Sequence, residues 1–226
     1  MNNYNPYSLR GKTILVEGLN SEIAQTVKDI CLEAEANVLS IPVDLTTEQI
    51  NEFVATSPLV DGLSLTQDAT KSIMAQFVTE KDATEYFVRN VTNKMLLCKL
   101  MFKAKKLKRG ASVVFSSSIA GIDNVHFGDV INATSSSAIR GMSKSMGLEF
   151  GAKGIRVNHV RYGVIATKDI SQVLSPEELA EKEKYFPLKR FGRPEDVANT
   201  IMFLLSEAST WITGADIRID GGYSVL

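Results

Sequence analysis

The sequence predicts an α/β fold in which a doubly wound parallel sheet is covered by helices on both faces. Short apolar runs alternate with longer amphipathic stretches along the chain, which is the pattern of such a sheet. Turn residues, glycine above all, separate the two kinds of segment. With 226 residues, of which 44% are hydrophobic and 23% charged, residues 1–226 suit one globular domain.

Apolar runs bounded by turn residues predict the strands, and helical spacing or capping signals predict the helices. The predicted strands are 13–16, 37–43, 63–65, 112–115, 156–160 and 216–219. The predicted helices begin near 21 and near 46 and run over 82–108, 132–150 and 194–205. Thr46 and Gln49 have the spacing of a capping box, and Pro194 suits a first helical turn.

Composition excludes several classes of function. A formal net charge of −1 gives no global attraction to nucleic acid or to an anionic membrane. The basic residues of 103–109 are expected at a helix C-terminus facing water. Cys31 and Cys98 have no metal-ligand spacing and are expected to be buried free thiols, and no metal site is predicted. With no apolar leader or membrane-length run, we expect a cytoplasmic protein.

The last third of the chain carries specific motifs. These are Lys-Gly-Ile-Arg-Val-Asn over 153–158, Phe-Pro-Leu-Lys-Arg-Phe-Gly-Arg-Pro-Glu-Asp-Val-Ala over 186–198, and Trp-Ile-Thr-Gly over 211–214 followed by Asp-Gly-Gly over 220–222. They resemble the short-chain dehydrogenase/reductase family, and within it the 3-oxoacyl-carrier-protein reductase branch. The resemblance implies a Rossmann-type sheet, an NAD(P) cofactor, and dimers or tetramers in which the tail forms part of a subunit interface.

The family's phosphate-binding turn, Thr-Gly-x-x-x-Gly-x-Gly, is altered here. The same positions hold Glu-Gly-Leu-Asn-Ser-Glu-Ile-Ala over 17–24, so only Gly18 is kept, with Ser21 and Ile23 as the other cofactor-facing positions. Glu22 places a carboxylate near the expected pyrophosphate, and two like charges about 4 Å apart repel by roughly 1 kcal/mol in water. Glu22 could instead turn outward and complement the helix N-terminus. In either orientation, cofactor affinity is expected to fall.

The adenosine side of the sheet is short. The interval from Gly18 to Thr66 is too small for two βα repeats, because one repeat with its neighbouring strand takes about 30 residues. The sequence therefore predicts six strands, with one βα repeat missing. Asp44 corresponds either to the family's ribose-binding acid or to the acid beside adenine. The family's Asn-Asn-Ala-Gly stretch is replaced over 66–69 by Thr-Gln-Asp-Ala.

The proton-transfer residues of the family are also replaced. A Tyr and a Lys four positions later share one helix face in the family. Asn132 and Ser136 stand at these positions, and a one-residue slip would substitute Ile131 and Ser135. Neither Asn nor Ser titrates near neutral pH. Ser118 matches the substrate-orienting Ser, and Asn90 matches the helix Asn of the proton relay, as vestigial candidates.

Two further residues have open interpretations. Tyr162 replaces the Pro of the family's Pro-Gly after the sixth strand. Its ring could plug the nicotinamide space, lie on the surface of a loop, or act as a displaced acid. His159 follows a strand Asn and is expected in the core or at an interface rather than in catalysis.

The altered motifs lead to a functional hypothesis. We expect a catalytically degenerate family member without a cofactor, acting as a partner or structural subunit of an active relative, in a homo-oligomer or hetero-oligomer. The alternative is an NAD(P)-dependent oxidoreductase that reduces a 3-oxoacyl, keto or sugar substrate with substituted residues. A second alternative is a small-molecule binding or regulatory protein.

Overall fold

The computed structural model describes residues 5–67, 72–168 and 175–225. Its centre is a six-stranded parallel sheet with the order β2-β1-β3-β4-β5-β6. The strands are β1 Thr13–Glu17, β2 Asn37–Ile41, β3 Val60–Thr66, β4 Leu107–Ser118, β5 Arg156–Tyr162 and β6 Asp216–Ile219. The predicted doubly wound sheet is confirmed.

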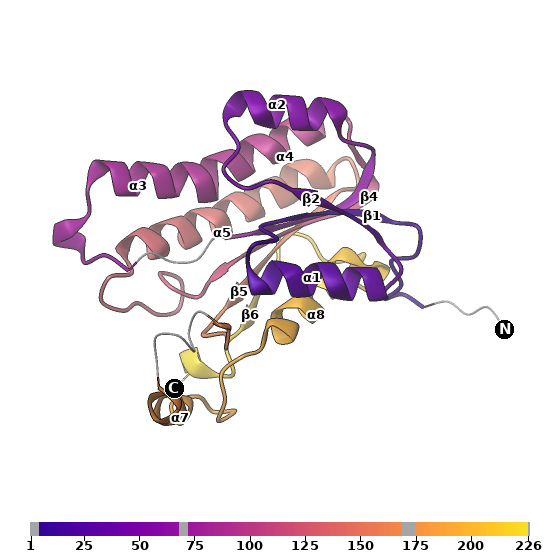
Figure 1. Ribbon diagram of the computed structural model, residues 1–226. Coiled ribbons are helices and arrows are strands. Elements are labelled where there is room, and N and C mark those ends of the chain that lie inside the picture. The colour runs from indigo at the N-terminus through magenta and orange to yellow at the C-terminus, as the bar shows by residue number, and fades with distance from the viewer. Residues whose placement is uncertain (1–4, 68–71, 169–174, 226) are drawn as a thin grey trace.

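Helices cover both faces of the sheet (Figure 1). One layer holds α2 Thr47–Thr56, α3 Glu80–Phe87, α4 Asn93–Lys103 and α5 Val130–Gly151, and the other holds α1 Glu22–Glu33 and α8 Pro194–Leu205. A π-helical segment, Val88–Thr92, joins α3 to α4, and α7, Pro176–Glu183, lies near the C-terminus. In the part of the chain that the structure describes, no helix is long and apolar enough to cross a membrane.

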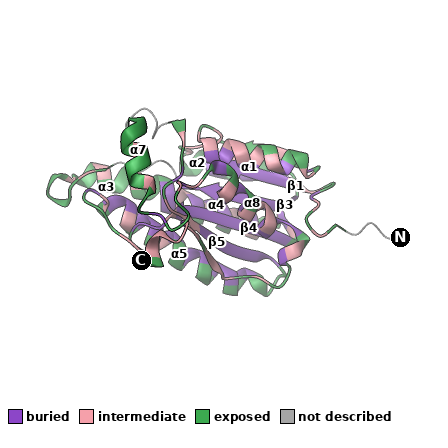
Figure 2. Cartoon of the chain, turned by 90° about the horizontal axis from the view of Figure 1, so that it is seen from below, coloured by how far each residue is buried: buried purple, intermediate pink, exposed green. Residues whose placement is uncertain are grey.

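Each face of the sheet has its own apolar core. Leu15, Leu63 and Phe115 face the α2–α5 layer, while Val16 and Val114 face the α1/α8 layer. The alternation follows from the strand period of two residues. Figure 2 shows the buried strands lying behind α1 and α8. Both cysteines are free and buried, as expected.

The structure shows where the missing repeat was lost. β2 is the edge strand of the sheet, next to β1. Along the chain it is the only strand between residues 17 and 60, where β1 ends and β3 begins. It ends at Ile41 rather than at the predicted residue 43, because Pro42 lacks an N–H and Asp44 has a positive φ of 60°. The prediction of six strands is confirmed.

One predicted helix has other bounds in the structure, and one helix was not predicted. The helix expected over 82–108 starts earlier, at Glu80, passes through the π-helical segment, and ends at Lys103. Lys105, with φ 55°, takes the left-handed conformation that ends a helix, and the chain enters β4 at Leu107. The basic stretch therefore spans a turn and a strand start, and only Lys103 lies in the last helical turn. The sequence analysis also missed α7, although Ser175 and Glu178 form its capping box.

The apolar stripe on α5 is covered by the sheet. Ile139, Met142 and Met146 lie in the core cluster, and Ala138 packs against it. The stripe is therefore part of the core and does not indicate a subunit interface. The exposed apolar residue of α5 near its end is Leu148.

Gly62 in β3 tests the closeness of this packing. A Cβ at Gly62 would lie 2.8 Å from Leu205 Cδ2 and 2.9 Å from Ile14 Cδ1. We expect Gly62→Ala to lower the free energy of unfolding by about 2 kcal/mol, because the core must shift to admit the methyl group. Gly141→Ala is the control, since a Cβ there meets nothing within 4 Å and alanine favours a helix. Urea denaturation measures both, and an equal stability of the two variants would contradict the prediction.

Candidate functional site

The topology marks one edge of the sheet as the place for a ligand. From β1 the chain passes to β2 on one side of it, and then crosses over to β3 on the other side of β1. Ligands of doubly wound sheets bind at the carboxyl ends of the strands beside this change of direction. The N-terminus of α1 and the carboxyl ends of β3, β4 and β5 meet there.

The turn before α1 has a glycine in the left-handed conformation and a serine that caps the helix. Gly18 has φ 78°, and Ser21 caps α1 by accepting a hydrogen bond from the Ala24 backbone N–H at 3.1 Å. Ile23 and Ala24 are buried in the core on the α1 side. The carboxylate of Glu22 accepts a hydrogen bond from the backbone N–H of Lys168 at 2.9 Å. Glu22 therefore reaches across the strand ends to the segment that follows β5.

A buried glutamine lies among the α5 residues that the sequence analysis assigned to the family's Tyr and Lys positions. Gln67, just beyond β3, donates from Nε2 to Asn132 Oδ1 at 3.0 Å and to Ser135 Oγ at 2.7 Å. Its Oε1 accepts from Ser136 Oγ at 2.9 Å. Asn132, Ser135 and Ser136 are all buried on α5. The amide of Gln67 thus pairs with both residues that replace the Tyr and Lys.

Ser118 and Asn90 lie beside this network. Ser118 ends β4, and its backbone N–H donates to Gln67 Oε1 at 3.4 Å while its Oγ accepts from the Ala120 N–H at 3.1 Å. Asn90 is fully buried in the π-helical segment and donates to the Tyr86 carbonyl at 3.2 Å. Helical π-segments are frequent at functional sites. The structure therefore brings Ser118, Asn132 and Ser136 together around Gln67, at one edge of the sheet.

Tyr162 lies on the other face of the sheet. It is the last residue of β5, half-buried, and packs with the core on the α1/α8 side. Asn132 and Ser136 lie on α5, in the opposite layer. Tyr162 is therefore a strand residue rather than a loop residue, and the side chain that contacts Asn132 is Gln67. Of the stretch 66–69, Asp68 and Ala69 lie outside the described residues.

His159 belongs to a second buried network under α5. Its Nε2 is 2.8 Å from Ser117 Oγ, and its Nδ1 is 3.0 Å from Asp216 Oδ1. Arg140 and Arg161 donate to the same carboxylate at 2.6 and 3.0 Å. Ser117 and His159 are completely inaccessible, so this Ser–His–Asp arrangement has no room for a substrate and joins β4, β5 and β6.

The electrostatics of Asp216 follow from these partners. Burial alone would raise the pKa of this carboxyl group. The hydrogen bond and charge of His159, with the charges of Arg161 and Arg140, outweigh burial and hold the pKa of Asp216 at about 2. The carboxylate is therefore ionised throughout the neutral range.

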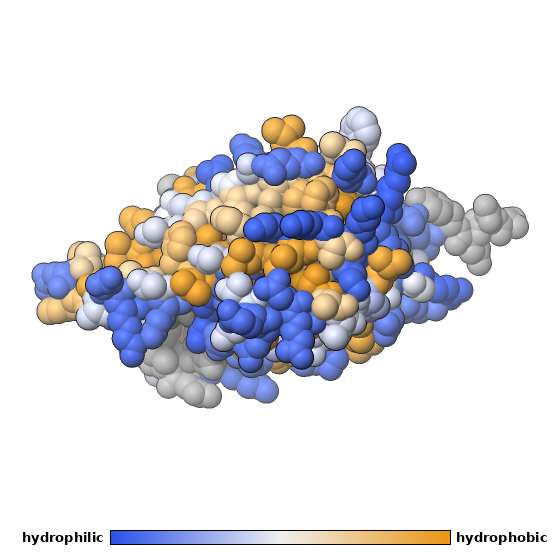
Figure 3. All heavy atoms as spheres, turned by 90° about the horizontal axis from the view of Figure 1, so that it is seen from above, coloured by the Kyte–Doolittle hydropathy of each residue, from blue (hydrophilic) through white to orange (hydrophobic). Residues whose placement is uncertain are grey.

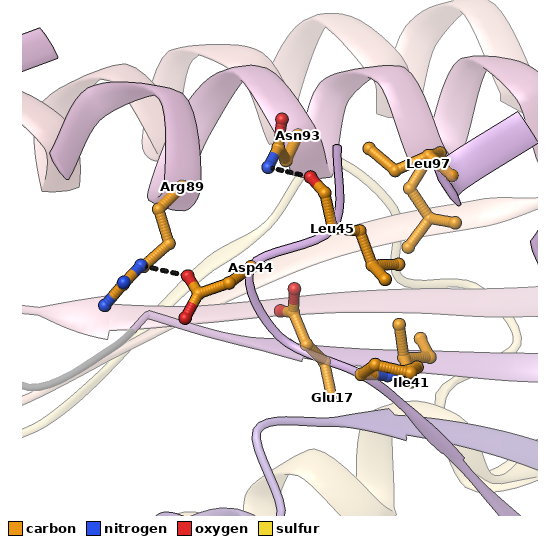
Figure 4. Close-up of a pocket in the computed structure, with 9 residues that line it drawn as sticks. Glu17, Ile41, Asp44, Leu45, Arg89, Asn93 and Leu97 are labelled. Atoms are coloured by element: carbon orange, nitrogen blue, oxygen red, sulfur yellow. Dashed lines mark hydrogen bonds and ion pairs between the residues drawn. The ribbon is translucent and has the colours of Figure 1, made fainter. Parts of the chain in front are cut away.

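Ion pairs lie beside the end of β2, and Figure 4 shows one of them, between Arg89 and Asp44. Lys94 of α4 forms a buried ion pair with Glu17 at the end of β1. Arg89 pairs with Asp44, which is half exposed, and Asn93 Nδ2 donates to the Leu45 carbonyl at 2.8 Å. The cavity that remains between these residues has a volume of about 10 Å³, which is room for one water molecule.

These residues do not fit a dinucleotide laid across the edge. Glu22 puts a negative charge at the phosphate end, and the space beside Asp44 has room for one water molecule. Gln67 already uses the side chains of Asn132 and Ser136 as hydrogen-bond partners. Ser64, Thr66 and Ser116 are the buried side chains of the described residues whose hydroxyls lack a partner. Three small hydroxyls suit water better than a phosphate dianion beside Glu22.

A larger cavity lies next to the edge. It has a volume of about 570 Å³, which is the size of a ligand pocket. Its lining comes from 74–76, 125–130 and the first turns of α5, and it includes Phe127, His126 and Asp129. No group of three or more His, Cys, Asp or Glu side chains in the described part of the chain could hold a metal ion.

Sequence reasoning missed Gln67, Lys94 and Arg89 as site residues. Gln67 was noted only as part of an altered stretch. Lys94 follows Asn90 by four positions, so the helical period places them near one face, but nothing in the sequence pairs it with Glu17. The pairing depends on the π-helical segment, which shifts the register of the helix.

Comparisons with known proteins agree on one family. Over residues 7–224 the chain matches the sequence family described as Enoyl-(Acyl carrier protein) reductase. The 3-oxoacyl-(acyl-carrier-protein) reductase FabG of Aquifex aeolicus (strain VF5) is 30% identical over 218 residues, covering 94% of this chain and 87% of that protein. The 7alpha-hydroxysteroid dehydrogenase of Escherichia coli (strain K12) is 26% identical over 221 residues, covering 96% and 86%.

Solved structures share the fold. A short chain dehydrogenase family protein from Francisella tularensis subsp. tularensis SCHU S4 superposes with a TM-score of 0.85 at 25% identity, covering 95% of this chain and 99% of that one. The RhlG/NADP active-site complex from Pseudomonas aeruginosa has a TM-score of 0.88 at 22% identity, covering 98% and 100%. The second likeness speaks for the fold alone.

The Glu17–Lys94 pair allows a double-mutant test. Lys94→Met leaves the Glu17 carboxylate buried without its cation, so we expect a loss of about 3 kcal/mol in the free energy of unfolding. Glu17→Gln combined with Lys94→Met removes both charges and should be less costly than Lys94→Met alone. Lys81→Met, in the exposed Lys81–Glu85 pair, is the control and should cost under about 0.5 kcal/mol. A double variant less stable than Lys94→Met would contradict this account.

The Asp216 network predicts a pH dependence. The folded-state pKa of Asp216, about 2, lies below its ordinary value of 3.8. The stabilisation is therefore fully present above about pH 4 and is lost as the pH falls toward 2. Asp216→Asn should lower the free energy of unfolding by about 2 kcal/mol at neutral pH, and by less at pH 2 to 3. Urea titrations across this range measure the difference, with Asp29→Asn on the exposed side of α1 as control. An Asp216→Asn penalty that is the same at pH 7 and pH 2.5 would refute the assignment.

Proposed function

Because the chain belongs to the short-chain dehydrogenase/reductase family, we propose that it is a member whose own reaction site is closed and which acts as a non-catalytic partner of an active relative. The observation that carries the proposal is the amide of Gln67, bonded to both Asn132 and Ser136. General acid–base catalysis needs a group that titrates near the working pH, and none of these three side chains does. We also propose a cytoplasmic location, since both cysteines are free.

The surface supports a role through contacts. Figure 3 shows apolar atoms gathered in a band across the face that carries α3 and α4. Phe87, Val88 and Met95 are exposed there, and Leu148 is 82% exposed at the end of α5. Contiguous exposed apolar surface marks interaction sites in soluble proteins. Val225, near the end of the tail, is also exposed. We propose that an oligomer with this chain or with a related dehydrogenase covers these residues.

The comparisons favour a second candidate, an NAD(P)-dependent oxidoreductase. The relatives named above are reductases and dehydrogenases, and one solved structure of the same fold is an NADP complex. In this case Gly18, Ser21, Ile23 and Asp44 would hold the cofactor and Ser118 the substrate oxygen. Kinship supports this candidate better than it supports a closed site. The geometry opposes it, since the described site residues include no titratable group at the Tyr and Lys positions.

The cavity of about 570 Å³ favours a third candidate, binding of a small molecule without chemistry. Its lining excludes Gln67, Asn132 and Ser136. The polar side chains of the lining are Gln76, His126, Asp129 and Thr134. A ligand could therefore occupy it while the Gln67 network stays intact. This candidate and the partner role are compatible.

Cofactor titration separates the first two candidates. We expect neither NADH nor NADPH to bind at physiological concentrations in calorimetry, and no oxidation of NADPH with a 3-oxoacyl thioester. Asn132→Tyr with Ser136→Lys should not restore activity, because Gln67 and Glu22 still occupy the site. An active FabG-type reductase serves as the positive control. A micromolar dissociation constant for either cofactor, with turnover, would establish the oxidoreductase instead.

Co-purification tests the partner role. We expect the tagged chain, expressed in its native cells, to recover a related dehydrogenase that keeps the Tyr and Lys, and light scattering to give a mass above the 24.8 kDa monomer. Met95→Glu should weaken that association, since a charge placed in an apolar interface is costly. Leu32→Glu, which places the same charge at an exposed apolar residue of α1 in the opposite helix layer, is the control. A clean monomer with no related dehydrogenase recovered would overturn the proposal.

A further inference from the structure

Glu22 has an unusual position for an acid in a first helical turn. Such residues usually complement the helix N-terminus locally. The Glu22 carboxylate instead accepts a hydrogen bond from the backbone N–H of Lys168, 146 residues away along the chain. The amide of Lys168 thus meets a side chain from the first turn of α1, where the first N–H groups have no partner within the helix. A carboxylate that accepts from a backbone N–H beside a helix N-terminus occupies a position that suits an anion.

The segment that Glu22 contacts is held at two other points. Gly163 donates to the Ile219 carbonyl at 2.9 Å, which joins the segment to β6. Ile165 and Gly192 form a β-bridge, and a Cβ at Gly192 would lie 2.6 Å from Ile165 Cδ1, so that a larger residue would displace the Ile165 side chain. Ile165 is buried in the same core cluster as Ile23 of α1. The Glu22 contact is the third point, at the far end of the segment.

A second feature shows that the strand ends near this turn suit a polar occupant. Val16 pairs with Ser64, so Thr66 stands at the level of Gly18 and faces the α1/α8 layer. Thr66 pairs with Ser116 in the register of β3 and β4, and the hydroxyls of both are buried without a partner. Buried hydroxyls are normally satisfied. These two hydroxyls lie at the strand ends beside the turn that carries Glu22, so this edge presents polar groups to an occupant.

We propose that the Glu22 carboxylate is a built-in anion that takes the place of a ligand phosphate and holds the segment 163–168 closed over the strand ends without any ligand. In a site built for a bound phosphate, closure of such a segment would depend on ligand concentration. Here the closing group is covalently part of the chain, so the segment is closed at all times. The inference does not depend on the proposed function, because closure is measured without a nucleotide.

Amide exchange tests the contact at the atom concerned. We expect Glu22→Ala to increase the hydrogen–deuterium exchange rate of the Lys168 amide, measured by NMR, by about tenfold. Glu22→Gln keeps an acceptor oxygen without its charge and should give a smaller increase. Glu33→Ala is the matched control, because it removes an exposed glutamate from the other end of the same helix. Its Lys168 amide should exchange at the wild-type rate.

Anion rescue tests the built-in ligand itself. Added formate or inorganic phosphate should restore slow exchange in Glu22→Ala, whereas chloride at the same ionic strength should not. An exchange rate in Glu22→Ala equal to that of Glu33→Ala would overturn the proposal. Fast exchange that neither formate nor phosphate slows would also overturn it, because the site would then not recognise an anion. If Glu22→Ala does not fold, Glu22→Gln with the same anions decides the question by the same criteria.

Discussion

The buried amide of Gln67 is the interaction on which the rest of the site depends. An amide has two donor hydrogens and an acceptor oxygen, so a single side chain can satisfy Asn132, Ser135 and Ser136 together. Each of these groups would be costly if buried without a partner. A tyrosine and a lysine could not simply replace Asn132 and Ser136, because the space and the hydrogen bonds already belong to Gln67. The network is a self-sufficient core that needs no ligand to be stable.

Beside β1 and β2, charged side chains likewise find their partners within the chain. With one βα repeat absent, α4 and the π-helical segment approach β1 and β2 directly, and Lys94 and Arg89 find their carboxylates at Glu17 and Asp44. A buried ion pair adds little net stability against an apolar alternative. The pair instead constrains the structure, because a lysine as buried as Lys94 is costly unless its ammonium group meets a carboxylate. The pair therefore fixes the position of α4 relative to the sheet.

The fold could be predicted from sequence because its signals are local. Apolar runs, glycine turns and the Thr46–Gln49 capping box depend on neighbouring residues, and the deficit of one strand follows from chain length alone. The site was predictable only as a set of positions. Asn132, Ser136 and Ser118 were placed by motif, but their partner Gln67 is distant in sequence and resembles any polar loop residue. Helical spacing predicts that one face of α5 is apolar, but it cannot tell which layer covers that face.

The exposed edge of the sheet at β2 bears on how readily the chain recruits a further strand. Removing a strand from a sheet exposes a row of backbone N–H and C=O groups that can recruit other chains and seed aggregation. β2 has five residues, and Pro42 follows it directly, so an incoming strand finds a short template that stops at a residue without an N–H. Few backbone pairs can therefore form along this edge, which limits the recruitment of a further strand.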